Sequence, residues 1–147
     1  MSEATERAGA FFGRRKGKKL RAGQDDLVQN LLPAIRVSPG SAPASLFPDR
    51  QARETWLEIG FGGGEHLAAQ ARAHRDINFI GCEPFVNGVA KLLAVVAAEN
   101  LLNVRLWDAD ATKLLPALPP SFRLKSICPP WSIIILILLS FSSPNNC

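Results

Sequence analysis

The most informative stretch of this chain reads Trp56-Leu57-Glu58-Ile59-Gly60-Phe61-Gly62-Gly63-Gly64-Glu65-His66. An apolar segment reaches a carboxylate and then passes into alternating glycines, a pattern typical of the first strand, loop and helix start of a nucleotide-type site. Glycine at positions 60, 62 and 64 allows positive φ and lets a ligand approach bare backbone. Taken alone, the motif is also compatible with a tight strand-to-helix turn that binds nothing.

The spacing of the glycines distinguishes two classes of cofactor. The dinucleotide fingerprint G-x-G-x-x-G requires its third glycine where this chain has Glu65, and it needs no acid inside the strand. An acid two positions before the first glycine can pair with the positively charged methionyl end of S-adenosylmethionine. The motif therefore favours S-adenosylmethionine over NAD, with Glu58, Gly60 and Gly62 as predicted contacts.

Two further predicted strands are also followed by acids. Residues 78–84 form an apolar segment that reaches Glu83 about twenty residues after the loop, where a carboxylate can accept from a ribose hydroxyl. Residues 103–111 predict a third strand that reaches Asp108 and Asp110, and we favour Asp110 as the acid that faces the adenine amino group. A solvated strand end explains any one acid alone. The repetition predicts a single site, because parallel strands end at one edge of the sheet.

Composition places the chain among single-domain α/β proteins. It has 147 residues, 47% of them hydrophobic and 20% charged. Its three cysteines have no metal-type spacing and lie apart from both histidines, so we expect a reducing compartment and no metal. The chain starts without a secretory signal, and the apolar run from Trp131 to Phe141 is far shorter than the roughly 20 residues that span a bilayer. We expect a cytoplasmic monomer without a membrane anchor.

Positive charge is concentrated near the start of the chain. Six of the 17 basic residues lie between Arg14 and Arg21, and the other eleven are outnumbered by 13 acids. Two aromatic residues, Phe11 and Phe12, precede this run, which suits contact with a polyanion through phosphate neutralisation. RNA is the expected polyanion, and a solvated basic tail is the alternative. The predicted phosphate contacts are Arg14, Arg15, Lys16, Lys18 and Lys19.

The sequence divides into three predicted parts. Residues 1–52 form a basic, partly disordered extension with a short helix at 22–32 that ends at Pro33; residues 53–128 form the α/β domain; residues 129–147 are an apolar tail. Within the α/β domain, apolar spacing predicts crossover helices at 64–74 and 86–100, a short helix at 112–118 and a fourth strand at 122–128. His66 and His74 are expected at the surface or at helix ends, not as ligands or bases.

Residues 11–120 resemble the bacterial tRNA (guanine-N7-)-methyltransferase (TrmB) family. The resemblance rests on the basic opening from Phe12 to Arg21, the glycine loop from Trp56 to His66, the corner Phe79-Ile80-Gly81-Cys82-Glu83-Pro84-Phe85 and the pair Asp110-Ala111. It implies a Rossmann-like class I S-adenosylmethionine-dependent methyltransferase fold and methylation of N7 of a guanine in tRNA. It also implies cofactor contacts at Glu58, Glu83 and Asp110, in agreement with the strand-end positions.

One segment departs from the family pattern. After the fourth strand the family carries Pro-Asp-Pro-Trp followed by Lys, Arg and His residues, and its Asp is the proposed catalytic acid. This chain reads Cys128-Pro129-Pro130-Trp131-Ser132 and has no acid after Asp110. No catalytic residue is therefore assigned, and we expect the N-terminal part of such an enzyme, truncated after about the fourth strand. The alternatives are a catalytically inactive cofactor- or RNA-binding fragment and a nucleotide-dependent oxidoreductase.

Overall fold

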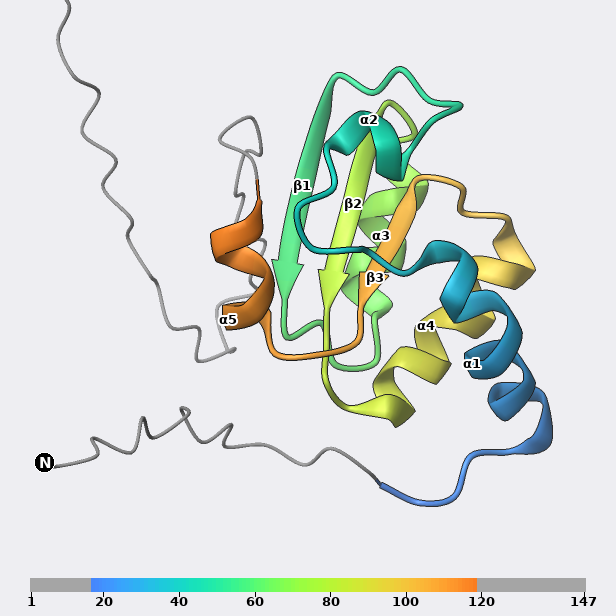
Figure 1. Ribbon diagram of the computed structural model, residues 1–147. Coiled ribbons are helices and arrows are strands. Elements are labelled where there is room, and N and C mark those ends of the chain that lie inside the picture. Colours follow the sequence, from blue (N-terminus) through green and yellow to red (C-terminus); the bar gives the residue numbers. More distant parts are fainter. Residues whose placement is uncertain (1–16, 119–147) are drawn as a thin grey trace, which may run out of the picture.

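The computed structural model describes residues 17–118, and these form a parallel sheet with helices on both faces (Figure 1). The sheet has three strands in the order β1 (Glu54–Ile59), β2 (Ile77–Cys82) and β3 (Val104–Trp107). Helices α3 (Glu65–Ala73) and α4 (Val86–Glu99) make the two crossovers, as predicted. Sequential parallel strands joined by helices are one half of a doubly wound sheet, so the α/β class is confirmed. The expected fourth strand and the apolar tail lie outside the described residues.

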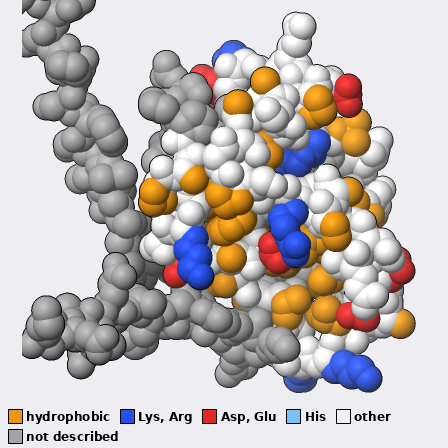
Figure 2. Space-filling view, in the orientation of Figure 1, with side chains coloured by type: hydrophobic (Ala, Val, Ile, Leu, Met, Phe, Trp, Pro, Cys, Tyr) orange, Lys and Arg blue, Asp and Glu red, His pale blue; other side chains and the backbone are white. Residues whose placement is uncertain are grey.

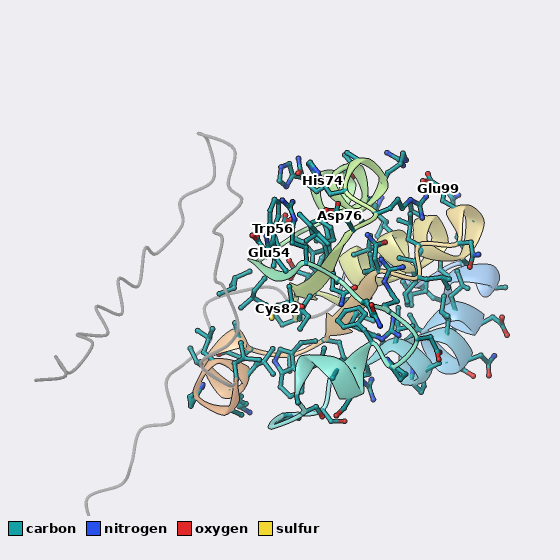
Figure 3. All side chains as sticks on the ribbon, turned by 90° about the horizontal axis from the view of Figure 1, so that it is seen from above. Glu54, Trp56, His74, Asp76, Cys82 and Glu99 are labelled. Atoms are coloured by element: carbon teal, nitrogen blue, oxygen red, sulfur yellow. The ribbon has the colours of Figure 1, made fainter. Side chains whose placement is uncertain are left out.

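Strand side chains alternate between two apolar clusters, one on each face of the sheet. Trp56, Phe79 and Leu106 pack beneath α3 and α4, whereas Leu57 and Ile80 pack beneath the opposite layer. That opposite layer contains α2 (Pro43–Leu46), α5 (Ala111–Leu114) and the 3-10 helix η1 (Leu115–Ala117). The view from above separates α3 and α4 from α2 and α5 (Figure 3). With both faces covered, the carboxyl edge of the sheet is left for a ligand.

The first helix is longer than the sequence predicted. Helix α1 (Ala22–Ile35) contains Pro33, which was expected to end it. Proline removes one backbone hydrogen bond, but here it lies in the last turn, where few bonds follow it. The apolar face of α1 packs on α4 through the fully buried Leu32, with Leu31 and Ile35 partly buried beside it. Tertiary packing therefore outweighs the local helix-ending signal.

The chain after α1 runs beside the third strand. The backbone N–H of Val37 donates to the carbonyl of Leu106 at 2.8 Å, and the Arg36 guanidinium donates to both carboxylate oxygens of Asp108 at 2.8 and 2.7 Å. Phe47 is buried on the face that also holds Ile80. Residues from the described segment 17–52, among them Leu32, Val37 and Phe47, thus pack on the α/β unit, while the predicted division into domains stays a prediction.

Candidate functional site

The glycine loop leaves β1 and starts α3 with three positive φ angles. Gly60, Gly62 and Gly64 have φ of 72°, 58° and 79°, as predicted from their spacing. A Cβ built on Gly60 or Gly62 would meet no atom within 4 Å, whereas a Cβ on Gly64 would approach Leu92 to 2.7 Å. The first two glycines therefore border open space, and the third is required by packing as well as by its backbone angle.

Glu83 fastens this loop to the start of α4. Its side chain is buried directly after β2, and Oε2 accepts from the backbone N–H of Gly62 at 2.8 Å while Oε1 accepts from that of Phe85 at 2.9 Å. Gly88 allows α4 to approach the loop closely, because a Cβ there would come within 2.0 Å of the Gly62 carbonyl oxygen. Each carboxylate oxygen has two lone pairs, so Glu83 can hold the loop and still accept from a ligand.

Glu58 forms a pair with His66 across the glycine loop. The Glu58 side chain is 8% exposed, that of His66 is 34% exposed, and Glu58 Oε2 lies 3.2 Å from His66 Nδ1. Burial raises the pKa of the Glu58 carboxyl above its usual value, and the adjacent imidazole partly offsets this. Within residues 17–118 the second oxygen, Oε1, has no hydrogen-bond partner. The site therefore contains a buried carboxylate that can still accept a hydrogen bond.

His66 lies in the first turn of α3, in agreement with the expectation of a surface or helix-end position, but its contact with Glu58 was not expected. The available signal was the spacing: eight residues carry the chain from the end of a strand, through a glycine turn, to the first turn of the following helix. Such a turn brings the helix start back beside the strand end. A donor at that helix position can thus reach a strand-end carboxylate.

Asp110 lies beyond β3 as the N-cap of α5. Its Oδ1 accepts from the backbone N–H of Thr112 at 2.9 Å and from the Thr112 hydroxyl at 2.8 Å, while its own carbonyl accepts from Trp107 Nε1. Asp108, in contrast, is held through both oxygens by Arg36. Since β1, β2 and β3 are parallel and adjacent, Glu58, Glu83 and Asp110 all lie toward the same edge of the sheet.

Asn87, the second residue of α4, anchors the basic run between Arg14 and Arg21 at Gly17 and Lys18. The backbone N–H of Gly17 donates to Asn87 Oδ1 at 2.8 Å, and Asn87 Nδ2 donates to the Lys18 carbonyl at 2.7 Å. Lys18 and Lys19 are exposed, whereas the other predicted phosphate contacts, Arg14, Arg15 and Lys16, lie outside the described residues. Asn87 is two positions from Phe85, so the segment joins the fold beside the Glu83 corner.

On the one face of the molecule that Figure 2 draws, positive charge is dispersed. On this face (Figure 2), the Lys and Arg side chains of residues 17–118 are separated from one another by hydrophobic and neutral groups.

Among residues 17–118, no three His, Cys, Asp or Glu side chains come together as metal ligands. No helix in this part of the chain has the length and apolar character needed to cross a membrane.

This geometry agrees with a match between the chain and a known protein family. A family model described as "Putative methyltransferase" matches residues 52–129, which include β1, the glycine loop, β2 and β3. The chain belongs to this methyltransferase family. Together with the parallel sheet, the match confirms the predicted Rossmann-like methyltransferase fold class.

Curated relatives of this methyltransferase chain confirm the resemblance noted in the sequence. Three are named tRNA (guanine-N(7)-)-methyltransferase: from Rhodopseudomonas palustris (54% identity, covering 76% of this chain and 43% of the relative), Agrobacterium fabrum (54%, 80% and 51%) and Chelativorans sp. (56%, 76% and 50%). The chain spans about half the length of these relatives. Among solved structures it is similar to the 16S rRNA methyltransferase KamB (24% identity, TM-score 0.43, covering 54% of this chain and 38% of that one).

Proposed function

We propose that this chain is the cofactor-binding part of a tRNA (guanine-N7-)-methyltransferase, which transfers a methyl group from S-adenosylmethionine to N7 of a guanine in tRNA. The observation that carries the proposal is the glycine loop, held against α4 by Glu83 and bordered by the buried Glu58. Membership of a methyltransferase family and relatives named for this activity support it.

The residues at the sheet edge fit S-adenosylmethionine in shape and charge. Gly60 and Gly62 leave open space beside bare backbone, where a Cβ would intrude on a ligand. The vacant acceptor of Glu58 suits the ammonium of the methionyl end, because a buried carboxylate gains most from a cationic partner. Glu83 is assigned to the ribose hydroxyls through its remaining lone pairs, and Asp110 to the adenine amino group.

The proposed methyl transfer depends on the positioning of the two reactants more than on proton transfer. When bound, S-adenosylmethionine supplies an electrophilic methyl group that the lone pair of guanine N7 can take up by direct displacement, without a general base. The residues of this chain contribute alignment, which is a large part of catalysis in such a reaction. Glu58 and Glu83 both border the glycine loop. We assign to them the positioning of the cofactor.

We assign tRNA binding to the basic segment, the run between Arg14 and Arg21. Its exposed Lys18 and Lys19 neutralise backbone phosphates, and Arg14, Arg15 and Lys16 extend the same run. Support comes from the Asn87 anchor, which fixes the point where the segment joins the fold, beside the cofactor corner. We also propose a cytoplasmic location, since the proposed substrate is tRNA.

A second candidate is a fragment that binds cofactor or RNA without catalysing methylation. It is favoured by Cys128-Pro129-Pro130-Trp131, which stands in place of the family segment with the proposed catalytic Asp. Two measurements on the full 147-residue chain separate the candidates: calorimetric titration with S-adenosylhomocysteine, and transfer of a labelled methyl group to guanine N7 of tRNA. Binding with transfer supports the enzyme, binding without transfer supports the fragment, and a folded chain that does not bind refutes the site.

A further inference from the structure

We propose that His66 is a positioning residue that holds the Glu58 carboxylate ready for the amino-acid end of the cofactor. This inference rests on the proposed function, because it assigns a role within the same site. His66 reaches the ligand through Glu58, since its ring nitrogen lies 3.2 Å from Glu58 Oε2. The remaining oxygen of the carboxylate is then the acceptor for the ligand ammonium.

The geometry around the pair explains why a positioning residue is needed. Glu58 is the next-to-last residue of β1, and its side chain is almost fully buried. A buried carboxylate without a donor loses hydration and tends to become neutral. A donor at Oε2 restrains the rotamer and favours the ionised form, and within residues 17–118 His66 is the one residue that hydrogen-bonds to this carboxylate.

The neighbouring acids are engaged elsewhere in the loop. Glu83 accepts from the backbone of Gly62 and Phe85. The Glu65 carboxylate lies over the loop backbone, since a Cβ on Gly63 would come within 2.5 Å of Glu65 Oε1. Neither acid takes the place of His66 as donor, because ionised carboxylates only accept.

The second histidine provides a matched control on the same helix. His74 is the C-cap of α3, and its ring centroid lies 5.7 Å from that of Trp56, with both side chains labelled in Figure 3. It follows the last residue of α3, whereas His66 is in the first turn. Replacing His74 therefore tests the loss of an α3 histidine without touching the Glu58 pair.

The test compares two ligands that differ in the amino-acid end. S-adenosylhomocysteine carries the ammonium and carboxylate, and 5′-methylthioadenosine shares the adenosine and sulfur but lacks both. In calorimetric titrations of the full chain, His66→Ala should weaken S-adenosylhomocysteine roughly tenfold and leave 5′-methylthioadenosine nearly unchanged, as expected for a lost bond to a charged group. His66→Asn should recover most of the affinity, because its amide nitrogen occupies the position of Nδ1. His74→Ala should affect neither ligand selectively.

The outcomes separate the role of His66 from the function of the site. Equal weakening of both ligands by His66→Ala, or no rescue by His66→Asn, would overturn the positioning role while the site stands. Circular dichroism checks each variant, and His66→Leu, which keeps side-chain bulk without a donor, is the second variant if His66→Ala does not fold. A folded wild-type chain that binds no S-adenosylhomocysteine would overturn the proposed function and the role of His66 together.

Discussion

Burial of the Glu58 carboxyl at the edge of the sheet costs stability when that carboxyl is ionised. Burial raises the pKa of its carboxyl above the ordinary 4.5, so the folded chain binds this proton more tightly than the unfolded chain does. The stability that the neutral form contributes is therefore complete below the ordinary pKa and is lost as the pH rises through the raised value. Glu58→Gln should unfold at higher denaturant concentration than wild type at about pH 7, with the gain disappearing near about pH 4.

The same variant should bind S-adenosylhomocysteine poorly, because its amide cannot pair with the ligand ammonium as a charge. Denaturant titrations at both pH values and calorimetry at neutral pH provide the measurement. A Glu58→Gln chain that is less stable than wild type at neutral pH would contradict the stated cost of burying this carboxylate.

Glu83 connects the glycine loop to α4, so its removal should be felt in both stability and binding. Glu83→Ala leaves the N–H groups of Gly62 and Phe85 without their acceptor, which should lower the free energy of unfolding by about 1–3 kcal/mol. Glu83→Gln keeps one acceptor oxygen and should lose less stability, though it loses the charge. Urea unfolding measures the first effect and cofactor titration the second. Unchanged affinity in Glu83→Ala would refute the ribose assignment.

At the residue scale, strand ends could be predicted and long-range contacts could not. Glu58, Glu83 and Asp110 were placed at one sheet edge because parallel strands share an orientation, which the order of elements already fixes. The partners of these acids depend on how the crossovers fold back. Asp110 illustrates this: its position was predicted, but its role as a helix cap follows from where α5 begins.

Among the elements, α4 has a glycine, Gly88, where it approaches the glycine loop, although glycine is unfavourable inside a helix. Alanine normally stabilises a helix over glycine by roughly 0.5–1 kcal/mol. At Gly88, however, a Cβ would come within 2.0 Å of the Gly62 carbonyl, which is far shorter than any contact that side-chain adjustment can relieve. Gly88→Ala should therefore destabilise the chain by about 1–3 kcal/mol and weaken S-adenosylhomocysteine binding.

Gly23 in α1 is the matched control, since a Cβ there meets nothing within 4 Å. Gly23→Ala should raise the unfolding midpoint slightly and leave binding unchanged. Thermal unfolding and calorimetry on both variants make the comparison. A stabilised Gly88→Ala chain with normal affinity would show that the close approach of α4 to the loop is dispensable.

Element positions were predicted best where local and tertiary preferences agree. The crossover helix α4 has apolar residues at helical spacing, and the same residues fill the core beneath it. Helix α1 is the exception, because Pro33 marks an end by local rules while Leu32 and Ile35 continue to pack on α4. A sequence pattern cannot weigh that packing before the partner surface is known.

In the whole molecule, the basic run and the α/β unit are two separate parts of the chain. The α/β unit contains the acids that border the glycine loop, while the basic run precedes α1 and meets the unit at Asn87. Net charge of +4 therefore understates how strongly one segment should attract a polyanion. Binding of tRNA by this chain should be electrostatic and should weaken as salt concentration rises.

Lys18 and Lys19 allow that expectation to be tested within the described residues. Replacing both by alanine should weaken tRNA binding and reduce the slope of log affinity against log salt by roughly two, about one for each lost phosphate contact. The control is the double variant Arg53→Ala and Arg75→Ala, which removes the same charge from the segments that precede β1 and β2, at the opposite edge of the sheet. Its slope should change much less, because those residues lie away from the basic segment. Fluorescence titrations of labelled tRNA at several salt concentrations measure both slopes, and equal slopes for the two variants would show that net charge, not the segment anchored by Asn87, governs binding.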